Sequence, residues 1–334
     1  MKPGKLSPAL LSELLDGVEL EDSRVVVGPR FGEDAAVIDL GDRCLVSTMD
    51  PVTFATDLIG WYLVQINAND VAVMGAAPKW MTATILMPPS CREEDVRQVF
   101  DQIHAACKEI GVTLVGGHTE ITPSVHRAIA IGALQGEATR DRVVFSSGAR
   151  PGDSILLTKA IAIEGTAILA REASDSLREN GVPAPVIEKA KSYLFSPGIS
   201  VVDASLRACS VAKIHAMHDP TEGGLAGGLL EIATAADVGV LVDAKQIPIL
   251  PECAVFCQAL GLNPLGLIAS GALIVALDRS DAPCLIEALE AEGIPVREIG
   301  LITLPAEGLK LKTADGVQDL PWFERDELAR FFGE

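Results

Sequence analysis

The chain has 334 residues, of which 49% are hydrophobic and only 4% are aromatic. At ~150 residues a domain, this length favours two domains, with cores of Ala, Val, Leu and Ile that suit layered α/β packing. The formal net charge of −19 excludes a general affinity for nucleic acid or for anionic membrane surfaces, because like charges repel. An anionic ligand would therefore need a local cation.

Seven cysteines are scattered along the chain without the dense spacing of a disulfide framework. Their odd number, and a start Met-Lys-Pro-Gly-Lys-Leu that lacks an apolar signal region, predict a protein of the reducing cytoplasm. No run reaches the ~18 apolar residues that a membrane span needs. Cys253 and Cys257 have i, i+4 spacing on a predicted helix, which indicates helix packing more readily than a metal site.

The first half of the chain begins with a short amphipathic helix and three short strands. Gly41-Asp42 separates the second strand from the third and predicts a hairpin turn. A long apolar helix then ends before Gly75 and Pro78, which are typical stop signals. The predicted elements are helix 8–15, strands 25–27, 35–40 and 44–48, helix 57–74, strand 80–87, helix 92–110 and strands 112–115 and 126–136.

Residues 148–153, Gly-Ala-Arg-Pro-Gly-Asp, form a turn-rich break. We place the domain boundary there, between 1–148 and 149–334. Strands and helices alternate again beyond it, which predicts an α/β domain with mixed sheets. The predicted elements are strand 154–158, helices near 164–175, 184–194 and 199–210, strand 213–217, helix 223–236, strand 238–243, helix 252–260, strand 272–277, helix 281–292 and strand 296–302.

Four aspartates, Asp34, Asp50, Asp70 and Asp219, stand where predicted strands or turns meet glycine. Asp70 lies in an otherwise apolar helical stretch, with Asn67 one turn earlier on the same face. Burying a carboxylate on such a helix is costly unless a cation or hydrogen-bond donors meet it. Either these two side chains face a bound cation, or they face solvent.

The segment that follows Asp219 combines residues typical of a helix start with glycines. Asp219 or Thr221 can cap a helix, and Gly223 and Gly224 remove side chains near its first turn. Exposed N–H groups at a helix start favour a phosphate, although no Walker Gly-Lys-Ser/Thr follows. Close packing of the helix on a sheet through glycine is the alternative.

A third candidate follows a predicted buried strand and consists of Gly116, Gly117, His118, Thr119 and Glu120. The glycines would let a ligand approach the backbone, and the glutamate could bind a metal. An ordinary turn at the end of the strand, with a hydrogen-bonded histidine, is the alternative. Carboxylates repel one another and repel phosphate, so gathering them makes sense if Mg²⁺ neutralises them and accepts phosphate oxygens.

Five motifs occur in the order found in the AIR-synthase-like (PurM-like) superfamily, which the chain resembles over roughly residues 25–305. They are Gly-Glu-Asp-Ala-Ala-Val, Ser-Thr-Met-Asp, Asn-Asp-Val-Ala-Val-Met-Gly-Ala-Ala-Pro, Gly-Gly-His-Thr-Glu and Asp-Pro-Thr-Glu-Gly-Gly-Leu-Ala. The superfamily includes aminoimidazole ribonucleotide synthetase, HypE, selenophosphate synthetase and thiamine-monophosphate kinase. Among these the chain is most similar to the hydrogenase maturation factor HypE.

The resemblance implies a two-domain α/β (α+β) fold whose N-terminal sheet forms a barrel across a homodimer, followed by an α/β domain. It also implies ATP between the domains, with Mg²⁺ held on the phosphates by aspartates of the first domain. The candidate metal ligands are Asp34, Asp50, Asp70 and Glu120. The candidate nucleotide-binding residues are Asn67, Gly116, Gly117, His118, Thr119, Asp219, Gly223 and Gly224.

Two departures from HypE bear on the reaction. HypE proteins end in a tail whose terminal cysteine carries the group that is dehydrated to a thiocyanate, whereas the last cysteine here is Cys284. HypE usually has Gly-Asp-Thr where this chain has Gly-Gly-His-Thr-Glu. The aromatic and leucine residues of 321–334 are spaced for one helical face that would dock on the second domain.

We therefore expect ATP-dependent activation of an oxygen atom on a small-molecule or protein-bound substrate. A kinase similar to thiamine-monophosphate kinase is one alternative. A non-catalytic nucleotide-binding maturation partner is the other.

Overall fold

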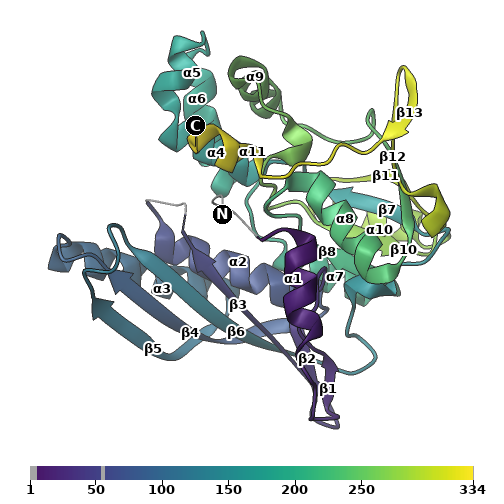
Figure 1. The fold of residues 1–334 in the computed structure, drawn as a ribbon, viewed down its shortest axis with the longest axis horizontal. Coiled ribbons are helices and arrows are strands. Elements are labelled where there is room, and N and C mark those ends of the chain that lie inside the picture. The colour runs from purple at the N-terminus through teal and green to yellow at the C-terminus, as the bar shows by residue number, and fades with distance from the viewer. Residues whose placement is uncertain (1–5, 54–56, 334) are drawn as a thin grey trace. The chain divides into compact units, whose positions relative to one another are not determined.

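The computed structural model describes residues 6–53 and 57–333, which divide into two compact units (Figure 1). The N-terminal unit consists of Leu20–Gly28 and Asp34–Val143. The C-terminal unit consists of Met1–Glu19, Pro29–Glu33 and Val144–Glu334. Helix α1 (Pro8–Asp16), which starts at the capping side chain of Ser7, therefore belongs with the second half of the sequence.

The N-terminal unit is a six-stranded sheet with two helices on one face (Figure 1). The strand order is β1-β2-β3-β6-β4-β5, and every pair is antiparallel except the parallel pair β4–β5. Helix α2 is buried almost all round, because it lies between the sheet and α3. The elements are β1 (Val25–Val27), β2 (Ala36–Asp39), β3 (Cys44–Val52), α2 (Ile59–Val73), β4 (Ala77–Met87), α3 (Glu93–Ile110), β5 (Thr113–Ile121) and β6 (Ile129–Ala138).

The C-terminal unit is built on a seven-stranded sheet of order β13-β12-β9-β11-β7-β10-β8. Strands β7 and β10 are buried along their whole length; β10 is entirely apolar, and β7 is apolar between Ser154 and Thr158, whose hydroxyls are hydrogen-bonded. The strands are β7 (Ser154–Thr158), β8 (Ile214–His218), β9 (Gly239–Asp243), β10 (Ile274–Leu277), β11 (Val296–Thr303), β12 (Leu309–Thr313) and β13 (Gly316–Asp319).

The helices of the C-terminal unit form two groups. Helices α7, α8 and α10 pack against the sheet, whereas α4, α5, α6 and α9 pack mainly on one another. Their bounds are α4 (Ile163–Glu172), α5 (Ser174–Glu179), α6 (Ala184–Lys191), α7 (Val202–Val211), α8 (Gly224–Ala236), α9 (Pro251–Leu260), α10 (Ala282–Glu290) and α11 (Glu327–Phe332). Within the described residues, no helix is both long enough and apolar enough to cross a membrane.

The mixed α/β architecture predicted from the sequence is confirmed, but some elements differ. The predicted strand 112–115 continues to Ile121, because its backbone pairs with β4 throughout, so the turn offered as the alternative for Gly116 to Glu120 is wrong. The predicted helix 164–175 is two helices that break at Ala173. Strands β12 and β13 were not predicted. The single helical face predicted for 321–334 is also wrong, since α11 begins at Glu327 and Trp322 is 57% exposed.

Candidate functional site

Asp70 is buried at the sheet face of α2, with 8% of its surface exposed. Its Oδ2 accepts a hydrogen bond from the Thr48 hydroxyl at 2.9 Å. The same hydroxyl lies 3.3 Å from the carbonyl oxygen of Asp34. Asp70 therefore points at the sheet, and the alternative that it faces solvent is wrong. Thr48 was part of a recognised motif, but sequence reasoning did not single it out.

Asn67 also joins α2 to β3, at Asp50, two residues after Thr48. Its Oδ1 accepts from the backbone N–H of Asp50 at 3.0 Å, and its Nδ2 donates to the carbonyl of Leu63 at 2.8 Å. Gly132 faces Asp50 on β6, and a Cβ there would lie 2.8 Å from Asn67 Nδ2, so this contact requires glycine. Asn67 and Asp70 lie one helical turn apart on α2, and they contact Asp50 and Thr48, which lie two residues apart on one face of β3. The Asn67 amide therefore fixes the position of β3 relative to α2.

The candidate metal ligands fall into two places in the N-terminal unit. Asp70 bonds Thr48 on β3, the backbone carbonyl of Asp34 lies beside the same hydroxyl, and Asp50 follows two residues later on β3, whereas Glu120 lies on β5, three strands from β3. Three strand spacings amount to about 14 Å, so the structure of this unit does not bring Glu120 to the aspartates. Across residues 6–53 and 57–333, no three His, Cys, Asp or Glu side chains are arranged to hold a metal.

The aspartates around Thr48 nevertheless fit a magnesium–phosphate complex. Mg²⁺ keeps several water ligands and is usually bound through one or two protein carboxylates together with phosphate oxygens. A dedicated cage of three protein ligands is therefore not required. Asp50 and Asp34 are half-buried beside the buried Asp70, which leaves carboxylate oxygens accessible at the edge of a protected site.

The five residues from Gly116 to Glu120 lie within β5, the edge strand of the N-terminal sheet. Nearly the whole strand is exposed. His118 Nε2 lies 3.5 Å from Glu120 Oε2, as expected for side chains two residues apart on one strand face. The exposed edge and its polar side chains form an accessible surface, distinct from the buried aspartate cluster.

In the C-terminal unit, Asp219 follows β8 and is buried. Helix α8 begins at Gly224, where a Cβ would lie 2.5 Å from the carbonyl oxygen of Leu265, so this residue packs against a loop, whereas Gly228 one turn later packs against His218 and Ile274 of the sheet. The N–H of Gly223 donates to Asp326 Oδ2 at 2.8 Å. A carboxyl group of the chain itself therefore occupies the helix start for which the sequence suggested a phosphate.

Two buried acids of this unit were not found from the sequence. Burial raises the pKa of Glu164 to about 7, with Ser270 opposing the shift and the charges of Glu222 and Asp326 adding to it. Burial likewise raises the pKa of Asp326 to about 7. Glu164 is a buried acid in the first turn of α4, next to Ile163 and before the apolar run 167–170, a signal similar to the one that drew attention to Asp70.

Glu33, in the motif Gly-Glu-Asp-Ala-Ala-Val, is held by several hydrogen bonds. Its two carboxylate oxygens accept from the backbone N–H groups of Ser146 at 2.9 Å and Ser147 at 3.1 Å, and Arg30 pairs with it at 2.6 Å. Glu33 belongs to the C-terminal unit and Asp34 to the N-terminal unit. Adjacent residues of one motif therefore serve different units.

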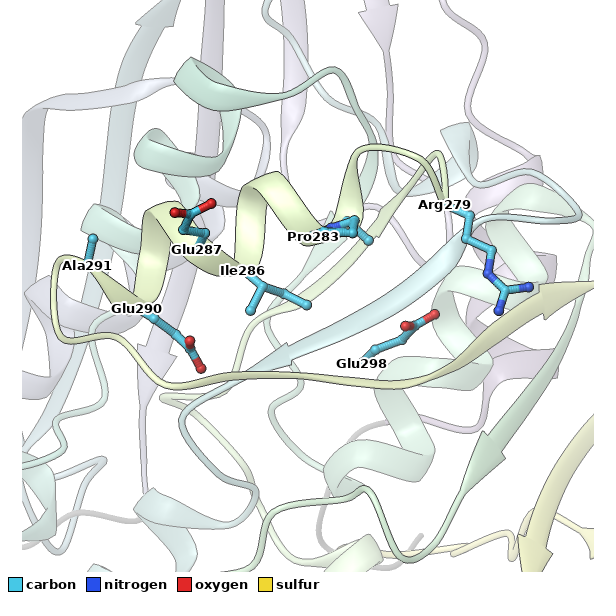
Figure 2. A pocket seen from close by; sticks show the side chains of 8 residues that line it. Arg279, Pro283, Ile286, Glu287, Glu290, Ala291 and Glu298 are labelled. Carbon is cyan, nitrogen blue, oxygen red and sulfur yellow. The ribbon is translucent and has the colours of Figure 1, made fainter.

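A shallow hollow of ≈ 630 Å³ lies beside α10, and Figure 2 shows the side chains that line it. Ile286 and Pro283 form its apolar part, and the lining also includes Arg279, Glu287 and Glu298. None of the candidate site residues lines this hollow.

Comparison with known families decides the classification. The model of the AIR synthase related protein N-terminal domain matches residues 32–134, and the model of the C-terminal domain matches residues 150–309. The chain belongs to the AIR synthase related family. The first match contains all four candidate metal ligands, and the second contains the segment from Asp219 to Gly224, whereas Asp326 lies beyond both.

Several relatives of the chain carry names from hydrogenase expression and maturation. The chain is 29% identical to a Methanocaldococcus jannaschii protein provisionally named hydrogenase expression/formation protein, over 95% of this chain and 94% of that protein. It is 28% identical to the carbamoyl dehydratase HypE of Cupriavidus necator, over 90% of this chain and 86% of that protein. The predicted resemblance to HypE is confirmed.

Solved structures agree on the PurM-like two-domain fold. HypE in a HypE–HypF complex has a TM-score of 0.76 at 22% identity, covering 94% of this chain and 100% of that one. HypE in complex with ATP has a TM-score of 0.69 at 22% identity, covering 96% of this chain and 91% of that one.

Proposed function

We propose that this protein binds ATP as its magnesium complex and uses it to activate an oxygen atom of a substrate by phosphorylation. The observation that carries the proposal is that the buried Asp70 bonds Thr48 on β3, where the backbone of Asp34 meets the same hydroxyl and the backbone of Asp50 is held by Asn67. The crystal structure of a HypE with ATP and the sequence similarity to a carbamoyl dehydratase support the same class of ligand.

In this proposal each residue of the cluster has a separate task. The carboxylates of Asp34, Asp50 and Asp70 would hold Mg²⁺, which would neutralise phosphate charge. Thr48 orients the Asp70 carboxylate by donating a hydrogen bond from its hydroxyl group. Asn67 fixes the backbone of Asp50, so that the Asp50 side chain keeps its place at the edge of the cluster. Such positioning supplies most of the catalysis that a protein contributes to phosphoryl transfer.

The protein is further proposed to be a homodimer through the β5 edge. Strand β5 leaves one side of its backbone unpaired in the described unit, and it exposes Val115 and Ile121, at 55% and 52%. Trp80 on the neighbouring β4 is also exposed. An exposed apolar edge strand needs a cover or a partner, and an identical strand across a two-fold axis provides one. A cytoplasmic location and a small-molecule or protein-bound substrate complete the proposal.

The test is titration calorimetry of the full chain with a non-hydrolysable ATP analogue, once with Mg²⁺ and once with a chelator. Binding is expected only with the metal, and equal affinity in both conditions contradicts the carboxylate–magnesium site. ADP release from ATP is then measured with candidate substrates. Metal-dependent binding without any ADP release would favour the non-catalytic maturation partner.

A further inference from the structure

Helix α1 of the C-terminal unit, purple in Figure 1, carries a row of exposed apolar side chains. Leu10 and Leu14 lie one turn apart on one face of the helix, and they are 38% and 58% exposed. Leu6 before the helix and Val18 after it continue the four-residue spacing along the sequence and are 41% and 49% exposed. Scattered exposed leucines are ordinary, whereas a continuous apolar stripe of this kind indicates an interaction surface.

The helix is too short to be stable without packing. It has nine residues, and isolated helices shorter than about 12–15 residues are marginal in water. The Ser7 hydroxyl caps it by accepting from the N–H of Leu10, but a cap contributes only about 1 kcal/mol. No residue of α1 is buried, and Leu11 and Leu15 are only half-buried. A surface that covers the stripe would therefore stabilise α1.

The charges around the stripe restrict what can cover it. Glu13 and Asp16 in α1, and Glu19 and Glu21 after it, are exposed and form no ion pair within the described part of the chain. The segment 6–23 has no Lys, Arg or His. An acidic surface would repel this segment, whereas lysine or arginine at the rim of an apolar surface would attract it.

The same charges oppose two other occupants. Two α1 helices packed side by side would bring Glu13 and Asp16 of one copy close to those of the other, so like charges disfavour pairing of α1 with itself. Anionic lipid headgroups repel the segment for the same reason. An amphipathic helix that lays its apolar face into a groove of another protein is a recurring mode of recognition. A groove with a basic rim fits both the stripe and its acidic flanks.

We propose that α1 is a docking element whose apolar stripe enters an apolar groove, rimmed by lysine or arginine, on a partner protein. The surface consists of other residues than the candidate site, so the proposal holds whether or not the protein uses ATP. It goes beyond the proposed function, because it assigns a second kind of protein as the partner of a named surface.

A synthetic helical peptide of about three heptads, with leucine at positions a and d and lysine at e and g, tests the complementarity on the full chain. A second peptide has glutamate in place of lysine. Hydrogen exchange is measured by mass spectrometry at about 0.15 M salt, which screens attraction by distant charges. Amides of residues 10–16 should exchange fast in the free chain and at least about tenfold more slowly with the lysine peptide. The glutamate peptide should have no effect.

A matched pair of double variants identifies the surface. Leu10→Ser combined with Leu14→Ser should weaken binding of the lysine peptide, measured by calorimetry, at least about tenfold. Leu304→Ser combined with Val317→Ser is the control, because it changes two residues of the same unit that are 58% and 61% exposed. This control should bind the peptide like the wild type.

Three outcomes would overturn the proposal. Equal affinity of the Leu10→Ser, Leu14→Ser variant and the wild type would show that net charge alone attracts the peptide. Amides of α1 that are already protected in the free monomer, or that do not respond to the lysine peptide, would show that the stripe is not an open docking surface. A wild-type dimer in light scattering that dissociates in this variant would assign the stripe to a second copy of the chain.

Discussion

Two buried aspartates, Asp70 in the N-terminal unit and Asp326 in the C-terminal unit, differ in what holds them. Asp70 accepts from the Thr48 hydroxyl, which also lies beside the backbone carbonyl of Asp34, and Asn67 of the same helix holds the backbone of Asp50. Asp326 accepts from two backbone N–H groups that belong to two different helix starts. The first arrangement suits a carboxylate that shares a cation with its neighbours. The second uses a carboxylate to join parts of the chain, so burial alone does not reveal which role an acid has.

The largest effect is expected at Asp70. Replacing Asp70 by Asn removes one charge from the proposed magnesium site, and a lost charged interaction of about 1.5–3 kcal/mol corresponds to a roughly 10- to 100-fold loss of affinity for Mg·ATP. Calorimetry of the variant measures this loss. Asp42→Asn, which changes an exposed aspartate of the same unit, should bind like the wild type. Equal affinity of Asp70→Asn and wild type for Mg·ATP would show that Asp70 does not bind the metal and is a structural residue like Asp326.

A smaller effect, on stability, is expected where Asn67 reaches β3. In Gly132→Ala the new methyl group would lie 2.5 Å from Met81 Cε and 2.8 Å from Asn67 Nδ2, so the free energy of unfolding should fall by about 1–3 kcal/mol. Urea denaturation provides the measurement. Gly116→Ala in the same sheet is the control, because its nearest neighbour would be Thr82 Cγ2 at 3.9 Å. Similar losses in both variants would show that the packing around Asn67 is not special.

The smallest effect is expected at the sheet edges, where the two units can also be compared. Val115 on β5 and Val317 on β13 are both exposed apolar residues of edge strands. If β5 pairs with itself, Val115→Lys should raise the dimer dissociation constant at least about tenfold, since a buried charge opposes association. Val317→Lys should have no effect. Light scattering across a concentration series distinguishes these outcomes, and a monomeric wild type would contradict the dimer.

Local patterns predicted much of the fold and part of the candidate site. The pairing of Asn67 and Asp70 followed from helical spacing, and the structure places both against β3. The helix start was predicted to within one residue, but the expected capping by Asp219 or Thr221 is wrong, because the N-cap residue is Gly223 and no side chain caps it. The course of β5 through Gly116 and Gly117 could not be predicted, because glycine usually marks a turn and the pairing with β4 is a property of the sheet.

The acids of the C-terminal unit were missed for a different reason. Asp326 meets Gly223 across 103 residues of sequence, and neither its neighbours nor its spacing shows that contact. Strands β12 and β13 are short and rich in polar residues, so they lack the apolar runs that revealed the other strands of this sheet. Contacts between distant segments decide both cases.

The hydrogen bonds from Ser146 and Ser147 to Glu33 decide whether the chain can be divided into two fragments. A single cut near residue 143 would leave the Glu33 carboxylate on one fragment and its amide partners, Ser146 and Ser147, on the other. Helix α1 would also be separated from the unit to which it belongs. Neither fragment would therefore contain all the residues of its unit. We expect the two fragments to fold only when they are expressed together and associate. Gene fusion or domain exchange at the centre of the chain would have to carry residues 29–33 along.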